Sequence, residues 1–251
     1  MQKNVLLVGE SWTSTSTHVK GFDQFATATW HSGAVDFMAA LKESDYAITH
    51  MPAHTAATEF PLDLETIQQW DVIILSDIGA NTLLLHPDTW LKSLRTPNRL
   101  KLIHDYVAAG GSLMMIGGYY SFQGINAGAR YRNTLVEKVL PVRCLAWDDR
   151  IETPEGSYAE VTMSHKVLSD MPEDWPWLLG YNEVEMQPEG TLLATIVGTT
   201  HPLLAVREYQ NGRSLVWTSD MSAHWLPEAF SQWKGYRQLW LNCLDWLTER
   251  T

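Results

Sequence analysis

Short apolar runs that alternate with helical patterns restrict the fold of this chain more than any other feature. The runs are Val5–Val8, Tyr46–Thr49, Val72–Leu75 and Leu113–Ile116. Helical spacing lies between the first two runs at residues 33–43, and short helical stretches precede the other two. One of these is expected to begin at Thr96-Pro97 and end at Gly110-Gly111. Parallel strands joined by crossover helices produce this order, so residues 1–124 are predicted to form a mainly parallel sheet.

The second half, residues 125–251, has a different pattern of apolar and polar residues. After a short helix at Asn133–Val139, it contains segments of alternating character at Tyr158–Met163, Tyr181–Met186, Leu192–Val197, Leu203–Tyr209 and Ser214–Thr218. Asn211-Gly212 between the last two segments predicts a β-hairpin. Because no repeat or linker interrupts the chain, we predict a single domain, 1–251, in which the second half adds antiparallel strands and a C-terminal helix.

Composition excludes several classes of function. The chain has 251 residues and a net charge of -11, and it contains no basic run, which argues against a nucleic-acid partner. The apolar run in Met1–Gly9 is too short to span a bilayer or act as a signal sequence, so we expect a cytoplasmic protein with no membrane contact. Two cysteines, Cys144 and Cys243, fit a reducing compartment, and Cys243 falls on an apolar helical stripe. No cofactor is expected.

Polar side chains that directly follow the apolar runs are the candidates for a ligand site, because ligands bind beyond the carboxyl ends of strands in open α/β sheets. We expect these side chains to converge around one concavity. The candidates for binding are Glu10, Ser11, Trp12, Asp77, Tyr119, Tyr120, Asp220 and Trp225, and the candidates for catalysis are Ser121 and His224.

Three stretches carry a resemblance to a known family: GGYYSFQG at 117–124, SHKVLSDMP at 164–172 and GRSLVWTSDMSAHWLPE at 212–228. With the strand and helix order, they resemble the class I glutamine amidotransferase-like superfamily, in particular its "putative amidotransferase" branch related to trehalose-utilisation-type proteins. The resemblance implies a flavodoxin-like three-layer α/β sandwich. It also implies a cysteine at the strand-to-helix turn, a histidine after a late strand and a glutamate two residues further on.

This chain departs from that triad at two of its three positions. The turn at 117–124 contains no cysteine, and the acid after His224 is Glu228, four residues on and beyond Pro227. Ser121 could replace the cysteine, with His224 as the base and Glu10, Asp220 or Glu228 orienting the imidazole. Alternatively, the Ser121 hydroxyl only caps the next helix.

Two main functions remain open on the sequence. The first is a small-molecule binding protein on an amidotransferase scaffold that lacks the cysteine nucleophile. The second is an active hydrolase or isomerase that acts on a sugar-like or amide substrate through His224 with Ser121 or a carboxylate. A lesser possibility is a subunit that serves mainly as the partner of another protein.

Histidines and tryptophans add two further expectations. His50 and His54 have the spacing of two metal ligands on a helix, but Pro52 lies between them, so no metal site is predicted from this motif. A site assembled from distant residues, such as His50 or His224 with Asp77, stays open. The chain has 12 tryptophans, whose flat faces suit a carbohydrate-like ligand. Those at 175 and 177 predict an exposed apolar patch in residues 171–181 and a homo-oligomer.

Overall fold

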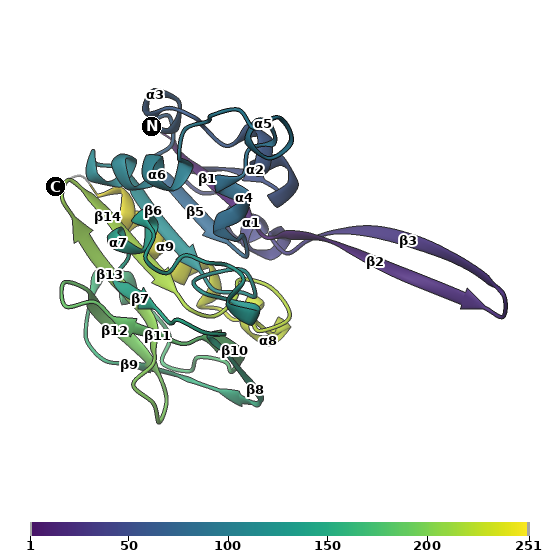
Figure 1. Ribbon diagram of the computed structural model, residues 1–251. Coiled ribbons are helices and arrows are strands. Elements are labelled where there is room, and N and C mark those ends of the chain that lie inside the picture. The colour runs from purple at the N-terminus through teal and green to yellow at the C-terminus, as the bar shows by residue number, and fades with distance from the viewer. Residues whose placement is uncertain (1, 250–251) are drawn as a thin grey trace.

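An eight-stranded sheet lies between two layers of helices in the computed structural model, which describes residues 2–249 (Figure 1). Five neighbouring strands are parallel: β4 (Tyr46–Met51), β1 (Lys3–Gly9), β5 (Val72–Ser76), β6 (Ser112–Ile116) and β14 (Gly212–Trp217). The antiparallel strands β13 (Pro202–Tyr209), β12 (Thr191–Ile196) and β9 (Ala159–Val161) extend the sheet from β14. The predicted α/β class, with a mainly parallel sheet and added antiparallel strands, is confirmed.

The parallel strands are apolar throughout because they are buried on both faces. In β1, Val5 and Leu7 pack into the core on one face, and Leu6 and Val8 pack into the core on the other. Figure 1 shows the helices that close these cores. The first is covered by α1 (Val35–Leu41) and α9 (Tyr236–Thr248), and the second by α2 (Ala53–Glu59), α3 (Leu64–Ile67), α4 (Ala80–Leu84), α6 (Arg99–Ala108) and α7 (Leu135–Val139).

Two local predictions were wrong in position. Helix α6 begins after Asn98, whose side chain accepts a hydrogen bond from the Lys101 amide at 3.1 Å, so the cap is not at Thr96. In the β13–β14 hairpin, Tyr209 pairs with Gly212, so Gln210 and Asn211 form the turn and Gly212 belongs to the strand. A Cβ at Gly212 would lie 2.2 Å from two carbonyl oxygens, which explains the glycine there.

Two small sheets lie beside the large one. The predicted strand at Tyr181–Met186 is split into β10 (Leu178–Asn182), paired with β8 (Arg150–Ser157), and β11 (Val184–Met186), paired with β7 (Val142–Cys144). The remaining short elements are α5 (Pro87–Lys92), α8 (Glu228–Ser231) and the 3-10 turns η1 (Ile125–Ala127) and η2 (Lys166–Leu168).

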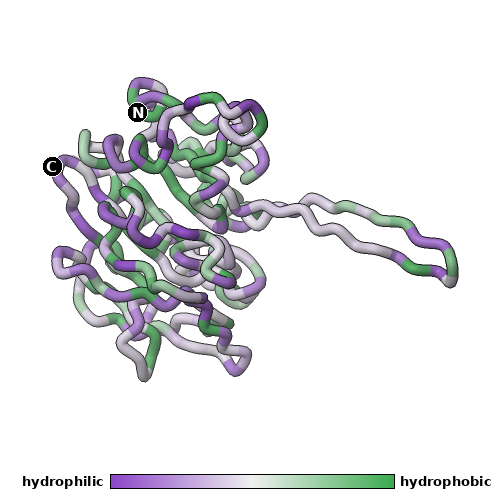
Figure 2. The backbone as a smooth tube through the Cα atoms, in the orientation of Figure 1, coloured by the Kyte–Doolittle hydropathy of each residue, from purple (hydrophilic) through white to green (hydrophobic). Residues whose placement is uncertain are grey.

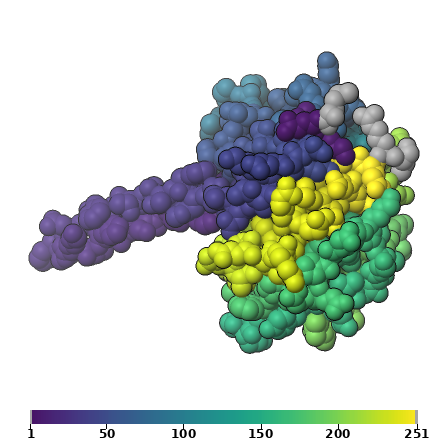
Figure 3. Space-filling model, turned by 180° about the vertical axis from the view of Figure 1, so that it is seen from behind, coloured from purple at the N-terminus to yellow at the C-terminus, as the bar shows by residue number. Residues whose placement is uncertain are grey.

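A long hairpin of β2 (Ser11–Lys20) and β3 (Asp23–Ser32) projects from the body into solvent (Figures 1 and 3). We call it the arm. Figure 2 shows that most of its length is neither strongly apolar nor strongly polar, and that contrasting residues gather toward the tip. The sequence analysis predicted no element in these residues.

The tryptophans and cysteines divide between core and surface. Trp175 is 9% exposed and its ring centroid lies 6.3 Å from that of Trp217, so of the two tryptophans in the predicted patch only Trp177, 41% exposed, reaches the surface. Both cysteines are buried and free, Cys144 on β7 and Cys243 on α9, where the apolar helical stripe predicted it.

Candidate functional site

The backbone is strained where β1 and β5 end. Glu10 and Asp77 follow these strands directly, with φ angles of +47° and +44°. Non-glycine residues rarely adopt positive φ, and such strain gathers at functional sites. The Glu10 amide donates to the Ser76 carbonyl at 2.7 Å, which ties the two strand ends together. The carboxyl edge of the sheet is therefore the first place to look for chemistry.

Glu10 is a buried carboxyl group held by two serines. Its side chain is 1% exposed and accepts hydrogen bonds from the hydroxyls of Ser76 at 2.6 Å and Ser222 at 2.8 Å. Burial and the nearby charge of Asp77 raise the pKa of Glu10 to about 7, although the two serines act in the opposite direction. Glu10 can therefore exchange a proton near neutral pH.

Two further carboxyl groups share this environment. Burial, followed by the charges of Glu10 and Asp77, raises the pKa of Asp220 well above its usual range, even though the amides of Met221 and Ser222 donate to it. Burial also raises the pKa of Asp77, whose Oδ1 accepts from the Tyr120 amide at 2.7 Å. Ionising all three carboxyl groups at once would cost electrostatic free energy. The cluster therefore keeps protons that isolated carboxyl groups would release at the same pH.

His224 lies on the loop after β14 and faces this edge. Its ring stands at 70° to that of Tyr119 with centroids 4.3 Å apart, and its Nε2 lies 4.0 Å from Glu152 Oε2. Partial burial lowers the pKa of His224, whereas the charges of Glu152 and Asp77 oppose that shift. A largely neutral imidazole beside carboxyl groups can accept a proton near pH 7.

Glu152 is positioned by two aromatic side chains. The Tyr119 hydroxyl donates to its Oε1 at 3.2 Å, and the Trp225 indole donates to its Oε2 at 2.9 Å. The Arg150 guanidinium lies over the Tyr119 ring, 5.0 Å from its centroid. Because Trp225 is fully buried, it contributes this hydrogen bond but no face for a ligand to stack on.

The turn after β6 is built around a glycine. Gly118 has φ +143°, and a Cβ there would lie 3.0 Å from Asp77 Oδ1. Its amide donates to Asn182 Oδ1 at 2.9 Å, and the neighbouring Gly117 amide donates to the Trp217 carbonyl at 2.8 Å. Both amides are therefore engaged within the protein. Of the residues with positive φ in this turn, Gly118 and Gly124 have no side chain, and Phe122 at φ +51° has a fully buried apolar one.

Ser121 has a structural role in the geometry. It is 2% exposed, donates to the Ile116 carbonyl at 2.5 Å and accepts from the Asp77 amide at 3.1 Å. Within residues 2–249, no hydrogen bond joins Ser121 to His224. The hydroxyl holds the ends of β5 and β6 together and does not cap the next helical turn, η1, whose N-cap is Gly124.

The remaining candidates lie around the same edge. Tyr120 is 47% exposed and Asp77 is partly accessible. Ser11 is buried and accepts from the Ala53 amide at 2.8 Å, whereas Trp12 lies at the root of the arm, stacked on His31. Glu10, Asp77, Asp220 and His224 thus lie near one another at this edge, whereas Ser11 bonds the backbone of α2; that these residues surround one concavity stays a prediction.

Sequence reasoning missed Arg150, Glu152, Asp149 and Asn182. Asp149 accepts from the Gln123 and Gly124 amides and from Asn182, so these residues hold the turn after β6 in place. Burial raises the pKa of Asp149 to about 6. All four lie on or beside β8 and β10, whose short strands carry no apolar run that would have marked their ends.

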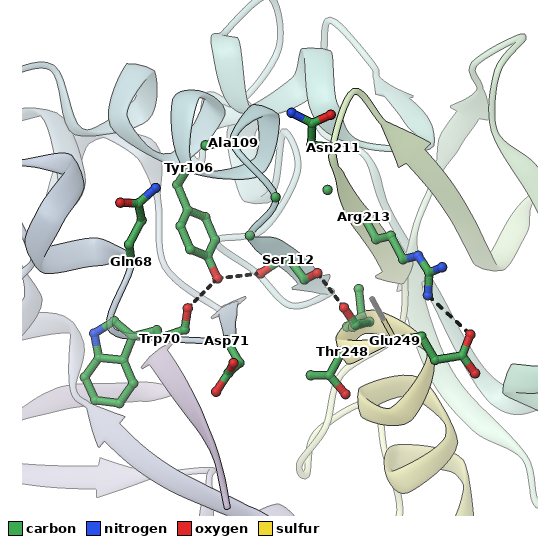
Figure 4. A pocket seen from close by; sticks show the side chains of 14 residues that line it. Gln68, Trp70, Asp71, Tyr106, Ala109, Ser112, Asn211, Arg213, Thr248 and Glu249 are labelled. Atoms are coloured by element: carbon green, nitrogen blue, oxygen red, sulfur yellow. Dashed lines mark hydrogen bonds and ion pairs between the residues drawn. The ribbon is translucent and has the colours of Figure 1, made fainter. Parts of the chain in front are cut away.

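A large cavity lies elsewhere, at the amino ends of the parallel strands (Figure 4). Its volume is about 560 Å³. Its polar side chains largely bind one another or the backbone: Tyr106 donates to the Trp70 carbonyl at 3.0 Å, and Arg213 lies 3.4 Å from Glu249. In residues 2–249, no group of three or more His, Cys, Asp or Glu side chains is placed to hold a metal ion, and no helix there is long and apolar enough to cross a membrane.

Comparisons with known proteins identify the family and the fold. The family model described as "Putative glutamine amidotransferase" matches residues 4–249. The chain is similar to the solved structure of the cytoplasmic protein STM3548 from Salmonella typhimurium, with 41% identity over 98% of this chain and 99% of that chain and a TM-score of 0.93. The cytoplasmic protein STM1381 from Salmonella typhimurium LT2 has 40% identity over 98% and 100%, with a TM-score of 0.92.

A more distant structure shares the fold alone. The thuA-like protein from Parabacteroides merdae has 12% identity over 98% of this chain and 89% of that chain, with a TM-score of 0.59. This likeness agrees with the resemblance to trehalose-utilisation-type proteins. No curated protein matches the chain.

Proposed function

The chain belongs to the family described as putative glutamine amidotransferases, and we propose that its carboxyl edge binds a small, hydroxyl-rich molecule without glutaminase chemistry. One observation carries the proposal: in the turn after β6, where this superfamily keeps its nucleophile, the residues with positive φ are Gly118, Gly124 and the buried Phe122, none of which is a nucleophile. Cys144 and Cys243 are fully buried elsewhere, and burial raises the pKa of both thiols, which keeps them unreactive.

Several features of the edge support a polar, carbohydrate-like ligand. His224, Glu152 and Arg150 present both hydrogen-bond donors and acceptors, and the Tyr119 and Tyr120 rings add aromatic surface. Sugars are bound by this combination, because their hydroxyls need both donors and acceptors while their apolar ring faces stack on aromatic groups. For location, we propose the cytoplasm, the word used for the two Salmonella proteins.

Binding can be tested with a panel of neutral mono- and disaccharides in isothermal titration calorimetry. We expect saturable binding of at least one sugar by the wild-type chain. His224→Asn should lower the affinity at least tenfold, the scale expected for loss of a well-placed hydrogen bond. His104→Asn is the matched control, because His104 on α6 bonds Tyr209 and lies outside the cluster. A panel without any binding would refute the carbohydrate-like ligand.

A second function, acid–base catalysis, is favoured by the pKa values. A neutral imidazole beside carboxyl groups with raised pKa values, among them Asp77, can both donate and accept protons, which a hydrolase or an isomerase requires. In that case Glu152→Gln and His224→Asn would each abolish turnover of a chromogenic glycoside or ester. Ser121→Ala would retain turnover per folded molecule, because its hydroxyl bonds only the backbone.

A further inference from the structure

We propose that the arm joins two copies of this chain, with each arm packed antiparallel along the arm of the second copy. The arm consists of two ten-residue strands and the turn Gly21-Phe22. Figure 3 shows it standing clear of the body. Its root lies at the carboxyl edge, where the Gly33 amide donates to the Glu10 carbonyl at 3.0 Å.

Within the described chain, residues 13–29 of the arm have no hydrogen bond or aromatic contact to the body, whereas Trp30 at the root meets His54 edge to face with ring centroids 6.3 Å apart. Residues 12–30 are exposed along both strands, and large apolar side chains lie among them: Phe22 is fully exposed, Val19 two-thirds exposed and Phe25 half exposed. A two-stranded hairpin is only marginally stable alone in water, and free strand edges invite pairing. A projection of this length is therefore expected to be covered when the protein is assembled.

The two faces of the arm differ in charge. The cross-strand pairs on one face include Trp12 with His31 and His18 with Phe25, both stacked, and the Lys20–Asp23 pair. The other face has no charged or histidine side chain. Its members, which we call the uncharged face, are Thr13, Thr15, Thr17, Val19, Gln24, Ala26, Ala28 and Trp30. Their small and β-branched side chains allow close packing of one sheet face on another.

Charge favours a second copy in an antiparallel arrangement. The whole chain carries a net charge of -11, whereas the only charged residues of the arm, Lys20 and Asp23, cancel to zero. Two copies can therefore meet through their arms with little repulsion. An antiparallel pairing places the bodies at opposite ends of an arm about 30 Å long, well beyond the screening length of about 8 Å. A parallel pairing would place two acidic bodies side by side.

The contact between the arms is small but can be completed at their ends. The uncharged face supplies eight residues a side, fewer than the roughly 20–30 of a standard interface, and the exposed tip adds contact where it meets the second copy. A twofold axis through the middle of the arms buries the same surface on both copies, which is the usual symmetry of a homodimer. Each tip, with Phe22, then reaches the root of the other arm and lies beside the carboxyl edge of the second copy.

Light scattering of the full chain at micromolar concentration tests the proposal. We expect twice the mass of one 28.5 kDa chain. Ala28→Asp, on the uncharged face, should weaken the dimer at least tenfold, whereas Thr27→Asp, which adds the same charge to the opposite face, should leave it intact. A third variant replaces residues 13–30 by Asn-Gly, which closes a two-residue turn between the paired Trp12 and His31 and should be monomeric. A monomeric wild type, or a shortened arm that still dimerises, would overturn the proposal.

Cysteine cross-linking tests the direction of pairing. Thr15→Cys lies near the middle of the arm and should form an oxidised dimer, since its own copy faces it across the twofold axis. Val19→Cys lies near the tip and should not cross-link alone, whereas the double variant Thr13→Cys with Thr17→Cys should, because these two positions are equally far from Thr15. The native cysteines are buried and do not compete. Equal cross-linking of the Val19→Cys and Thr15→Cys variants would refute the antiparallel arrangement.

Discussion

The two edges of the central sheet differ: one contains a large cavity, and the other contains the residues with unusual backbone angles and pKa values. The amino edge has a cavity of about 560 Å³, but there Arg213 and Glu249 form an ion pair, and the backbone accepts from Tyr106 and Ser112. The carboxyl edge has strained residues, buried carboxyl groups with raised pKa values and an imidazole with a lowered one. Strain and shifted pKa values cost stability, so their concentration at one edge indicates function more strongly than volume does.

Glycine variants should give the largest difference between the edges. At the carboxyl edge, Gly118→Ala forces φ +143° on a residue with a side chain and places its Cβ 3.0 Å from Asp77. Strain and overpacking together should lower the free energy of unfolding by about 4 kcal/mol. At the amino edge, Gly110→Ala has φ +115° but its Cβ lies 3.6 Å from the nearest atom, so we expect a loss of about 1–2 kcal/mol.

Urea denaturation measures both variants. Equal losses of unfolding free energy in the two variants would mean that the turn after β6 tolerates a side chain and does not require glycine.

The next largest difference between the two edges should be in the pH dependence of stability. Glu10 has a pKa of about 7 when folded against 4.5 for the ordinary group, so the folded state binds its proton more tightly. The free energy of unfolding should therefore be highest below about pH 4.5 and fall as the pH rises through about 7, by up to roughly 3 kcal/mol from this group. Glu10→Gln cannot ionise, so its stability should fall less over this range.

Glu249 at the amino edge provides the control. Lys166 and Arg213 lower its pKa, so its stabilisation is present above the ordinary range of a glutamate and is lost only as the pH falls through the lowered pKa. Because Glu249 is exposed, Glu249→Gln should change stability little at neutral pH. Thermal melts from pH 4 to 8 decide between these outcomes, and parallel curves for wild type and Glu10→Gln would contradict the assignment.

Cysteine substitution should have the smallest effect. Neither Cys144→Ser nor Cys243→Ser should change any sugar binding or turnover measured per folded molecule, since both thiols lie outside the site. The wild-type chain should release no ammonia from glutamine in a coupled assay. Glutaminase activity that disappears on thiol alkylation would show that the nucleophile lies at one of these cysteines.

The parallel core could be predicted from sequence because burial on both faces leaves an apolar run at each strand, as in Val5–Val8 and Val72–Leu75. The same runs located Glu10, Asp77 and His224 at one edge, since parallel strands end together. Ser121 could not be assigned, because a serine at a turn bonds either a base or the backbone, and only coordinates distinguish the two.

The arm and the role of Glu152 could not be predicted from the sequence, for a different reason. Strands β2 and β3 are exposed on both faces, so their serines, threonines and alanines carry no alternation between apolar and polar. Strand β8 contains Pro154 and Gly156, which obscure its pattern and so concealed Arg150 and Glu152. Alternation of apolar and polar residues arises when one face of a strand is buried, so a strand exposed to water on both faces does not show it.

Nuclear magnetic resonance of the histidine rings distinguishes the two edges, because His224 lies at the carboxyl edge and His104 lies near the amino edge. The saturating probe is the tightest-binding sugar of the mono- and disaccharide panel, and the His224 signals are assigned from their loss in His224→Asn. We predict that the sugar shifts the His224 signals and leaves those of His104, near the amino edge, unchanged. Shifts confined to His104, with His224 unmoved, would contradict the carboxyl-edge site.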